Sequence, residues 1–318
     1  MSEECKPYVS IVFSFRNEED VLEELLDRLH AVLEPTGVDY EFIFVNDAST
    51  DRSLQILTER AKNDPCIRVI NMSSRFGVDP CFLAGMRHAT GDAVITMDTD
   101  LQDPPEMIPG LILEWKKGMD VVHTTRTGRE GESVVKMRLT RLAYYILDKM
   151  SDVHVPMDTG MFKLMSRRVV DTITALEETD AFLRGLITWV GFNQTQVFYT
   201  REERFAGVAH FAWTGKDPWL VFARGLLSFS RMPLVILLAL GTLITVPAFL
   251  RLGVMLLGGL FGAEYYAGRF DYTLLVFIGG VQIIGIATVG FYVSRAYNQV
   301  KKRPEYIIES TSGFSEDG

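Results

Sequence analysis

The stretch that decides the fold is DTDLQ at residues 98–102, directly after the apolar run AVITM at residues 93–97. A short β-branched run that follows a glycine predicts a buried strand. Acidic side chains at the carboxyl end of such a strand reach the crevice where open α/β sheets bind ligands. Asp98, Asp100 and Gln102 offer the oxygen ligands of a hard divalent cation that also holds a diphosphate. The alternative is an acidic surface turn, because two prolines follow at residues 104 and 105.

The chain before this stretch alternates between two hydrophobic periods. Apolar runs at 8–15, 40–45 and 67–70 predict strands, and stretches with helical apolar spacing up to residue 32, at 53–62 and at 80–89 predict helices. This strand-helix order favours an α/β fold with a parallel sheet. Neither G-x-G-x-x-G nor a G-x-x-x-x-G-K-[ST] loop is present, which disfavours a dinucleotide dehydrogenase and a P-loop enzyme.

Composition narrows the class of protein further. The net charge of -9 disfavours a nucleic-acid partner, which would require a basic surface. The three cysteines, Cys5, Cys66 and Cys81, lack the spacing of a metal site or a disulfide framework. The first residues are acidic and polar, unlike a signal peptide, so we expect the catalytic part in the cytoplasm.

Hydropathy divides the chain into four parts. Residues 1–215 mix charged and apolar residues, residues 216–231 predict an amphipathic juxtamembrane helix, and residues 295–318 form a basic tail expected to be disordered after Pro304. Residues 232–250 and 272–294 contain no charged residue, and each run is long enough to span a membrane. We therefore expect a two-helix hairpin within 232–294. Basic residues flank its two outer ends, which predicts that both termini are cytoplasmic.

Five ordered motifs carry a family resemblance: NE at 17–18, NDASTD at 46–51, SRFG at 74–77, DTDLQ-x-PPE at 98–106 and DTGMF at 158–162. Together they resemble the family-2 glycosyltransferases of GT-A fold. With the two spans, the chain resembles the polyisoprenyl-phosphate glycosyltransferases within that family, over about residues 8–306.

The resemblance implies roles at the donor end of the site. Ser14, Glu18, Asp47 and Asp98 would contact the nucleotide, with Asp47 accepting a hydrogen bond from the base. Asp98, Asp100 and Gln102 would bind Mg²⁺ or Mn²⁺, which makes Asp100 catalytic. A carboxylate that caps a helix in a turn is the alternative for Asp47.

The resemblance also implies roles at the acceptor end. Asp158 matches the proposed catalytic base, and Arg126, Arg201 and Arg204 would bind the acceptor phosphate, although Arg126 could instead be a solvated surface residue. A lipid phosphate is already mostly ionised at neutral pH, by analogy with phosphoserine, so Asp158 could orient the acceptor instead of removing a proton.

The resulting hypothesis is an inverting transferase that moves one sugar, glucose from UDP-glucose, to a polyisoprenyl phosphate. UDP is favoured over GDP, and we expect a homo-oligomer. A processive polysaccharide synthase is the first alternative, but its Gln-x-x-Arg-Trp signature is absent. The second is a membrane scaffold with a decayed transferase domain. Departures from the family pattern support it, at Ser14, Arg16, Ala209 and His210.

Overall fold

The computed structural model describes residues 8–126, 159–176, 182–200, 243 and 272–314. The strands are β1 (Tyr8–Phe15), β2 (Asp39–Asn46), β3 (Ile67–Met72), β4 (Ala93–Asp98), β5 (Val121–Arg126), β6 (Thr159–Ser166), β7 (Gln194–Tyr199) and β8 (Ile308–Ser312). The helices are α1 (Leu22–Leu33), α2 (Ser53–Ala61), α3 (Val78–His88), α4 (Ile108–Lys116), α6 (Arg167–Thr174), α7 (Leu183–Trp189) and α10 (Tyr272–Lys301). Short 3-10 turns lie at Glu34–Thr36 and Pro105–Met107.

These strands form one mixed sheet in the order β7-β5-β6-β4-β1-β2-β3-β8. The predicted parallel pairing is confirmed for β1 with β2, β2 with β3 and β1 with β4. The sheet is not wholly parallel, however, because β6 runs antiparallel between β4 and β5. The chain builds outward from β1 through β3 and then returns to place β4 on the other side of β1. Such a reversal of strand order opens a crevice at the carboxyl ends of the two strands.

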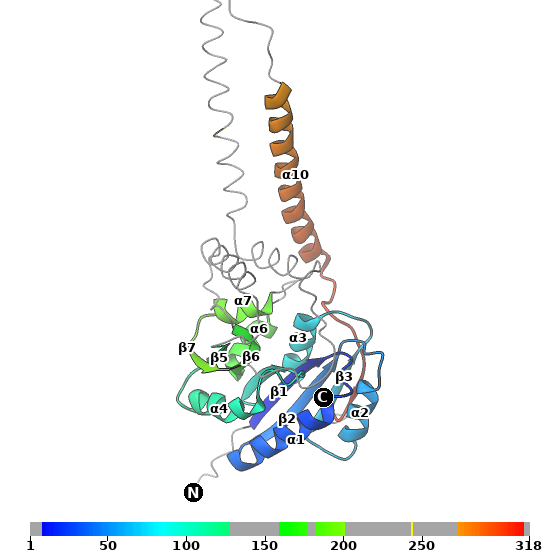
Figure 1. The fold of residues 1–318 in the computed structure, drawn as a ribbon, viewed down its shortest axis with the longest axis vertical. Coiled ribbons are helices and arrows are strands. Elements are labelled where there is room, and N and C mark those ends of the chain that lie inside the picture. The colour runs from blue at the N-terminus through cyan, green and yellow to red at the C-terminus, as the bar shows by residue number, and fades with distance from the viewer. Residues whose placement is uncertain (1–7, 127–158, 177–181, 201–242, 244–271, 315–318) are drawn as a thin grey trace, which may run out of the picture.

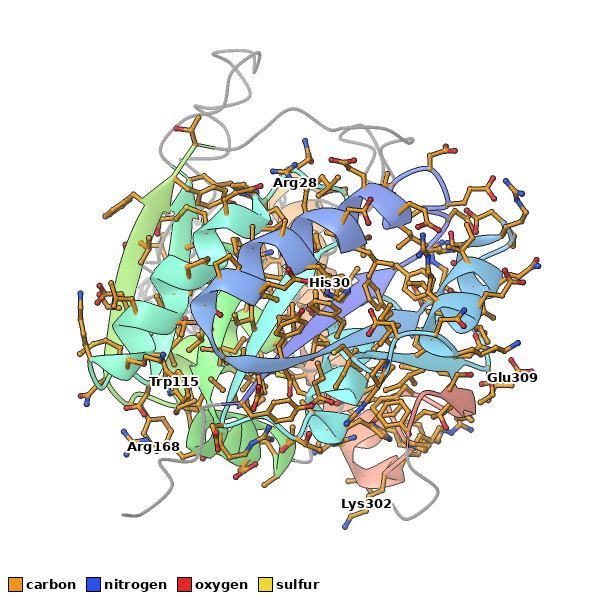
Figure 2. All side chains as sticks on the ribbon, turned by 90° about the horizontal axis from the view of Figure 1, so that it is seen from below. Arg28, His30, Trp115, Arg168, Lys302 and Glu309 are labelled. Carbon is orange, nitrogen blue, oxygen red and sulfur yellow. The ribbon has the colours of Figure 1, made fainter. Side chains whose placement is uncertain are left out.

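Helices cover both faces of the sheet (Figure 1). One core cluster joins a sheet face to α1, α2 and α4, and the other joins the opposite face to α3, α6 and α7. The apolar face predicted for α1 is confirmed at Leu22, Leu25, Leu26 and Leu29, whereas Leu33 is buried in place of the predicted Val32, which is only partly buried. The outer side of α1 carries Arg28, whose guanidinium forms a bidentate ion pair with Glu106 just before α4 (Figure 2).

The prediction that the tail after Pro304 is disordered is wrong. Residues 308–312 form β8, which pairs antiparallel with β3 and covers what would otherwise be an open sheet edge. Phe314 adds a cation-π contact with Arg68 and an edge contact with His88. The tail therefore forms the edge strand of the sheet next to β3. Its polar sequence carries no strand pattern of its own, and the backbone groups of β3 supply the template.

The predicted membrane segments are described only in part. Residues 216–231 and the first predicted span, 232–250, lie outside the described residues apart from residue 243. The second, 272–294, falls within α10, which runs away from the α/β layers (Figure 1). In the parts of the chain that the structure describes, we find no helix with the length and apolarity that a membrane crossing requires. Membrane spanning stays a prediction.

Close packing of α3 on the sheet generates a first testable prediction. A Cβ atom added at Gly85 would overlap Val12 and lie 3.2 Å from Val45, two stiff side chains that are fully buried. We expect Gly85→Ala to lower the free energy of unfolding by about 1–3 kcal/mol. Gly110→Ala on α4 is the matched control, because that position is open, and it should raise stability by up to about 1 kcal/mol. Equal thermal shifts in the two full-length variants would contradict the packing argument.

Candidate active site

The carboxyl ends of β1, β2, β4, β5 and β7 meet at one edge of the sheet, and β6 starts there. Ser14, near the end of β1, is the register partner of Asp98 at the end of β4. Two predicted residues that lie far apart in the sequence are thus neighbours on adjacent strands, as the hypothesis of a common nucleotide site requires.

Hydrogen bonds between backbone amides and side chains join the turn after β1 to the segment after β2. Asn17 adopts a left-handed conformation with a φ of 55°, which asparagine tolerates better than most residues. Its side-chain oxygen accepts a hydrogen bond from the amide of Thr50 at 2.7 Å. The amide of Glu18 donates to the Ser53 hydroxyl at 2.8 Å. These contacts hold the buried Glu18 side chain at the rim of the site.

Asp47, which is predicted to bind the nucleotide, also holds the loop that precedes α3. Its carboxylate accepts hydrogen bonds from the amides of Phe76 at 2.7 Å and Gly77 at 3.0 Å, immediately before α3. These amides belong to the loop before Val78, the first residue of α3, and neither α2 nor α3 has a side-chain hydrogen bond at its N-cap, so the contacts do not bear out the helix-capping alternative. A carboxylate has about four acceptor positions, so capacity for a nucleotide base remains.

The DTDLQ stretch forms a compact turn at the end of β4. Leu101 is buried with a φ of 55°, and the Asp100 carboxylate accepts a hydrogen bond from the Gln102 amide at 3.2 Å. Asp100 is only 8% exposed, and Asp98 is partly buried. This geometry favours a built site over the alternative of a solvated acidic turn.

Burial, and after it the proximity of other carboxylates, shifts the pKa of Asp98 in this turn. Burial, Asp103 and Asp100 together raise the pKa of Asp98 to about 7, against the opposing effect of Arg126 and Arg184. A divalent cation at this position would relieve that repulsion, and the donors are the hard oxygens that Mg²⁺ and Mn²⁺ prefer. The residues present thus fit such a cation by the type of their donor atoms. Within the described ranges, no group of three or more His, Cys, Asp or Glu side chains is placed to hold a metal ion.

Arg126 lies at this edge but already has protein partners. Its Nη2 atom donates to both carboxylate oxygens of Asp103, at 3.3 and 3.4 Å, and its Nε atom donates to the Tyr199 hydroxyl at 2.9 Å. The solvated-surface alternative is therefore wrong, because only 13% of the Arg126 side chain is exposed. Whether it binds the acceptor phosphate stays a prediction.

Three predicted residues, Asp158, Arg201 and Arg204, lie outside the described residues. Their sequence neighbours are described. Thr159 begins β6 opposite Thr125, and Tyr199 ends β7 in parallel register with Arg126. All three predicted residues are therefore joined to the described structure at the same edge of the sheet.

Sequence reasoning missed Asp103, Tyr199 and Lys163. Asp103 is fully buried and follows Gln102 directly, so the third carboxylate of the motif was a usable signal. Lys163 is fully buried on β6, and its Nζ atom finds no hydrogen-bond partner among the described residues. Strand alternation places it on the apolar face of the sheet with Met161 and Met165, and that alternation was the signal for it.

The buried lysine generates a second prediction. Burial and Arg184 lower the pKa of Lys163 to about 7, although Asp79 acts in the opposite direction. The unfolded chain binds this proton more tightly, so Lys163 costs stability, and the cost grows as pH falls from about 10 toward 7. We expect Lys163→Met to raise the melting temperature of the full chain, by more at about pH 6.5 than at about pH 9.5.

Lys116→Met, at an exposed position of α4, is the control and should change the melting temperature little at either pH. A gain in Lys163→Met that did not depend on pH would show that Lys163 keeps its proton in the folded protein.

Comparisons with known proteins identify the family of the chain. The chain is 38% identical over 306 residues to the uncharacterized glycosyltransferase YkcC of Bacillus subtilis (strain 168), which covers 96% of this chain and 94% of the relative. It is 35% identical over 304 residues to the SfII prophage-derived bactoprenol glucosyl transferase of Shigella flexneri, which covers 95% of this chain and 98% of that one.

Among solved structures, the mannosyltransferase PcManGT from Pyrobaculum calidifontis, in complex with GDP-Man and Mn²⁺, is similar with a TM-score of 0.47. Its sequence is 18% identical, and the match covers 89% of this chain and 88% of that one. The mixed α/β sheet fits a GT-A fold. Residues 10–174 match the description of glycosyl transferase family 2. This match and the near full-length identities together show that the chain belongs to glycosyl transferase family 2.

Proposed function

We propose that this protein is an inverting glycosyltransferase that moves one sugar from a nucleoside diphosphate to a polyisoprenyl phosphate. The observation that carries the proposal is the 35% identity, over 95% of the chain, to a protein named bactoprenol glucosyl transferase. Bactoprenol is a polyisoprenol, so the acceptor would be its phosphate. Glucose from UDP-glucose is the sugar donor that we favour, with UDP preferred over GDP.

The donor nucleotide would lie at the carboxyl ends of β1, β2 and β4. Glu18 and Asp47 bring buried carboxylates to its rim, where they can accept hydrogen bonds from the base. Ser14 would meet the ribose side, next to Asp98. The interlocked turns after β1 and β2 support this assignment because a pre-organised pocket loses little entropy when it binds its ligand.

Asp98, Asp100 and Gln102 would hold Mg²⁺ or Mn²⁺. When bound, the cation would neutralise the negative charge that develops on the departing nucleoside diphosphate. The crowding of Asp98 by Asp103 and Asp100 supports a cation at this place.

The acceptor supplies its own nucleophile. An oxygen of the lipid phosphate attacks the anomeric carbon, a new carbon-oxygen bond forms, and the bond from that carbon to the diphosphate breaks with inversion. The nucleophilic oxygen is mostly ionised at pH 7, so Asp158 would chiefly orient the acceptor and would remove a proton only from the singly ionised form. Arg126, Arg201 and Arg204 would hold the phosphate, because guanidinium binds phosphate through two hydrogen bonds.

A lipid acceptor requires an enzyme at a membrane. We propose that residues 232–294 anchor the protein by two spans, with the catalytic domain and both termini on the cytoplasmic side. The charge-free runs and their flanking basic residues support this arrangement. We further propose that copies of the chain associate as a homo-oligomer.

The third prediction tests the reaction itself. Full-length protein is incubated with undecaprenyl phosphate, Mn²⁺ and a panel of radiolabelled UDP- and GDP-sugars. We expect a lipid-linked monosaccharide from UDP-glucose and no ladder of longer products. Asp100→Asn should lower the rate by about 100-fold or more, because charge stabilisation in the transition state is lost. A chelator should stop the reaction and added Mn²⁺ should restore it.

Asp39→Asn is the matched control, since this exposed carboxylate starts β2 at the opposite end of the sheet. Full activity of Asp100→Asn would refute the metal assignment, and a ladder of products would favour a processive synthase. No product from any donor would refute the proposed reaction.

A further inference from the structure

Arg126, Asp103 and Tyr199 form a closed hydrogen-bonded triad at the carboxyl edge of the sheet. Arg126 donates to both partners, and the Tyr199 hydroxyl in turn donates to the Asp103 carboxylate. All three side chains are removed from water, Asp103 completely. Each polar group of the triad therefore satisfies another in a setting where an unpaired one would be costly.

The triad joins four segments that carry the proposed site. Asp103 ends the turn that contains Asp98, Asp100 and Gln102. Arg126 ends β5, and Tyr199 ends β7 two residues before Arg201. The backbone of Gly160, two residues after Asp158, packs so closely that an added Cβ atom would lie 2.9 Å from Arg126 Nη2.

This arrangement constrains the Arg126 guanidinium in a specific way. Its Nε and Nη2 atoms are bound by Tyr199 and Asp103, which fixes the plane of the group. The described contacts leave the Nη1 atom unused. Because the plane of the guanidinium is fixed, its Nη1 atom is pre-organised to donate a hydrogen bond to an anion. An arginine without these partners would first have to lose rotamer entropy.

Stability alone is a weak explanation for the triad. A buried ion pair contributes little net stability compared with apolar side chains of similar volume, because both charges lose their hydration. The carboxylate of Asp103 also adds negative charge beside Asp98. Asp103 therefore costs free energy twice, through its own desolvation and through repulsion of Asp98. A role in positioning Arg126 between the donor and acceptor sides of the site explains it better than stability does.

We propose that Asp103 and Tyr199 are positioning residues that orient the Arg126 guanidinium toward the phosphate of the lipid acceptor. This inference rests on the proposed function. It adds two residues to which the sequence analysis gives no role, and assigns to them the affinity for the acceptor and not the binding of the donor.

The fourth prediction is a kinetic separation in the full-length enzyme. Asp103→Asn and Tyr199→Phe should each raise the KM for undecaprenyl phosphate by about 10-fold, the loss expected when one charge-assisted hydrogen bond is misaligned. In Tyr199→Phe, which leaves the charge of Asp103 in place, the KM for the sugar donor and the Mn²⁺ requirement should stay within about 3-fold, a range of less than 1 kcal/mol. Gly160→Ala should give the same pattern, since it displaces Arg126 without changing either partner.

Matched controls are Asp39→Asn and Tyr40→Phe, at the opposite end of the sheet, which should leave both KM values unchanged. Coupling to Arg126 is the decisive test. In an Arg126→Ala background, Asp103→Asn and Tyr199→Phe should have no further effect on the acceptor KM, because their partner is absent.

The alternatives have distinct outcomes. Additive effects in the Arg126→Ala background would overturn the inference, as would a common loss of kcat and melting temperature with the acceptor KM unchanged. A lower acceptor KM in Asp103→Asn would also overturn it, because Asp103 would then compete with the phosphate for Arg126. Tyr199→Phe removes a single hydroxyl and provides the test if Asp103→Asn does not fold. Failure of the wild type to form lipid-linked sugar would refute the proposed function itself.

Discussion

Repulsion among buried carboxylates at the end of β4 is the constraint on which the rest of the site depends. Asp98, Asp100 and Asp103 lie within six residues, and burial together with repulsion by Asp103 and Asp100 raises the pKa of Asp98 to about 7. Such a cluster is stable only if positive charge or hydrogen-bond donors compensate it. The protein supplies part of that compensation through Arg126, whose charge is shared with Asp103 and the Tyr199 hydroxyl. The divalent cation that we propose for this site would supply the rest.

Sheet topology explains why this charge gathers in one place. The chain returns from β3 to place β4 beside β1, and this reversal brings Ser14 next to Asp98. The antiparallel strand β6 then contributes its beginning, where the parallel strands contribute their ends. Groups from the start and the end of consecutive strands therefore meet at the same edge, and the helices on both faces keep that edge rigid.

Much of the fold was predictable because short-range patterns dictate it. The leucines of α1 have helical spacing, and the strands β1 to β4 are apolar runs bounded by turns, so local periodicity alone identifies them. The short polar strand β8 was not predictable, since it forms only against the edge of β3. The same reasoning separates the site residues. Ser14, Asp98 and Asp100 lie at predicted strand ends, whereas Tyr199 meets Asp103 across 96 positions of sequence, a contact that no local pattern encodes.

The sequence by itself determined the class of fold, the positions of the acidic residues along the strands and, through its ordered motifs, the family. Periodicity and motif spacing are local properties, and strand ends converge at one edge in any parallel α/β sheet. The tertiary structure alone decided which of these residues are partners. In it, Asp47 accepts hydrogen bonds from amides just before α3, Lys163 is fully buried, and Arg126 is hydrogen-bonded to Asp103 and Tyr199. Hydrogen bonding and desolvation depend on distances between segments far apart in the chain, and only packing sets those distances.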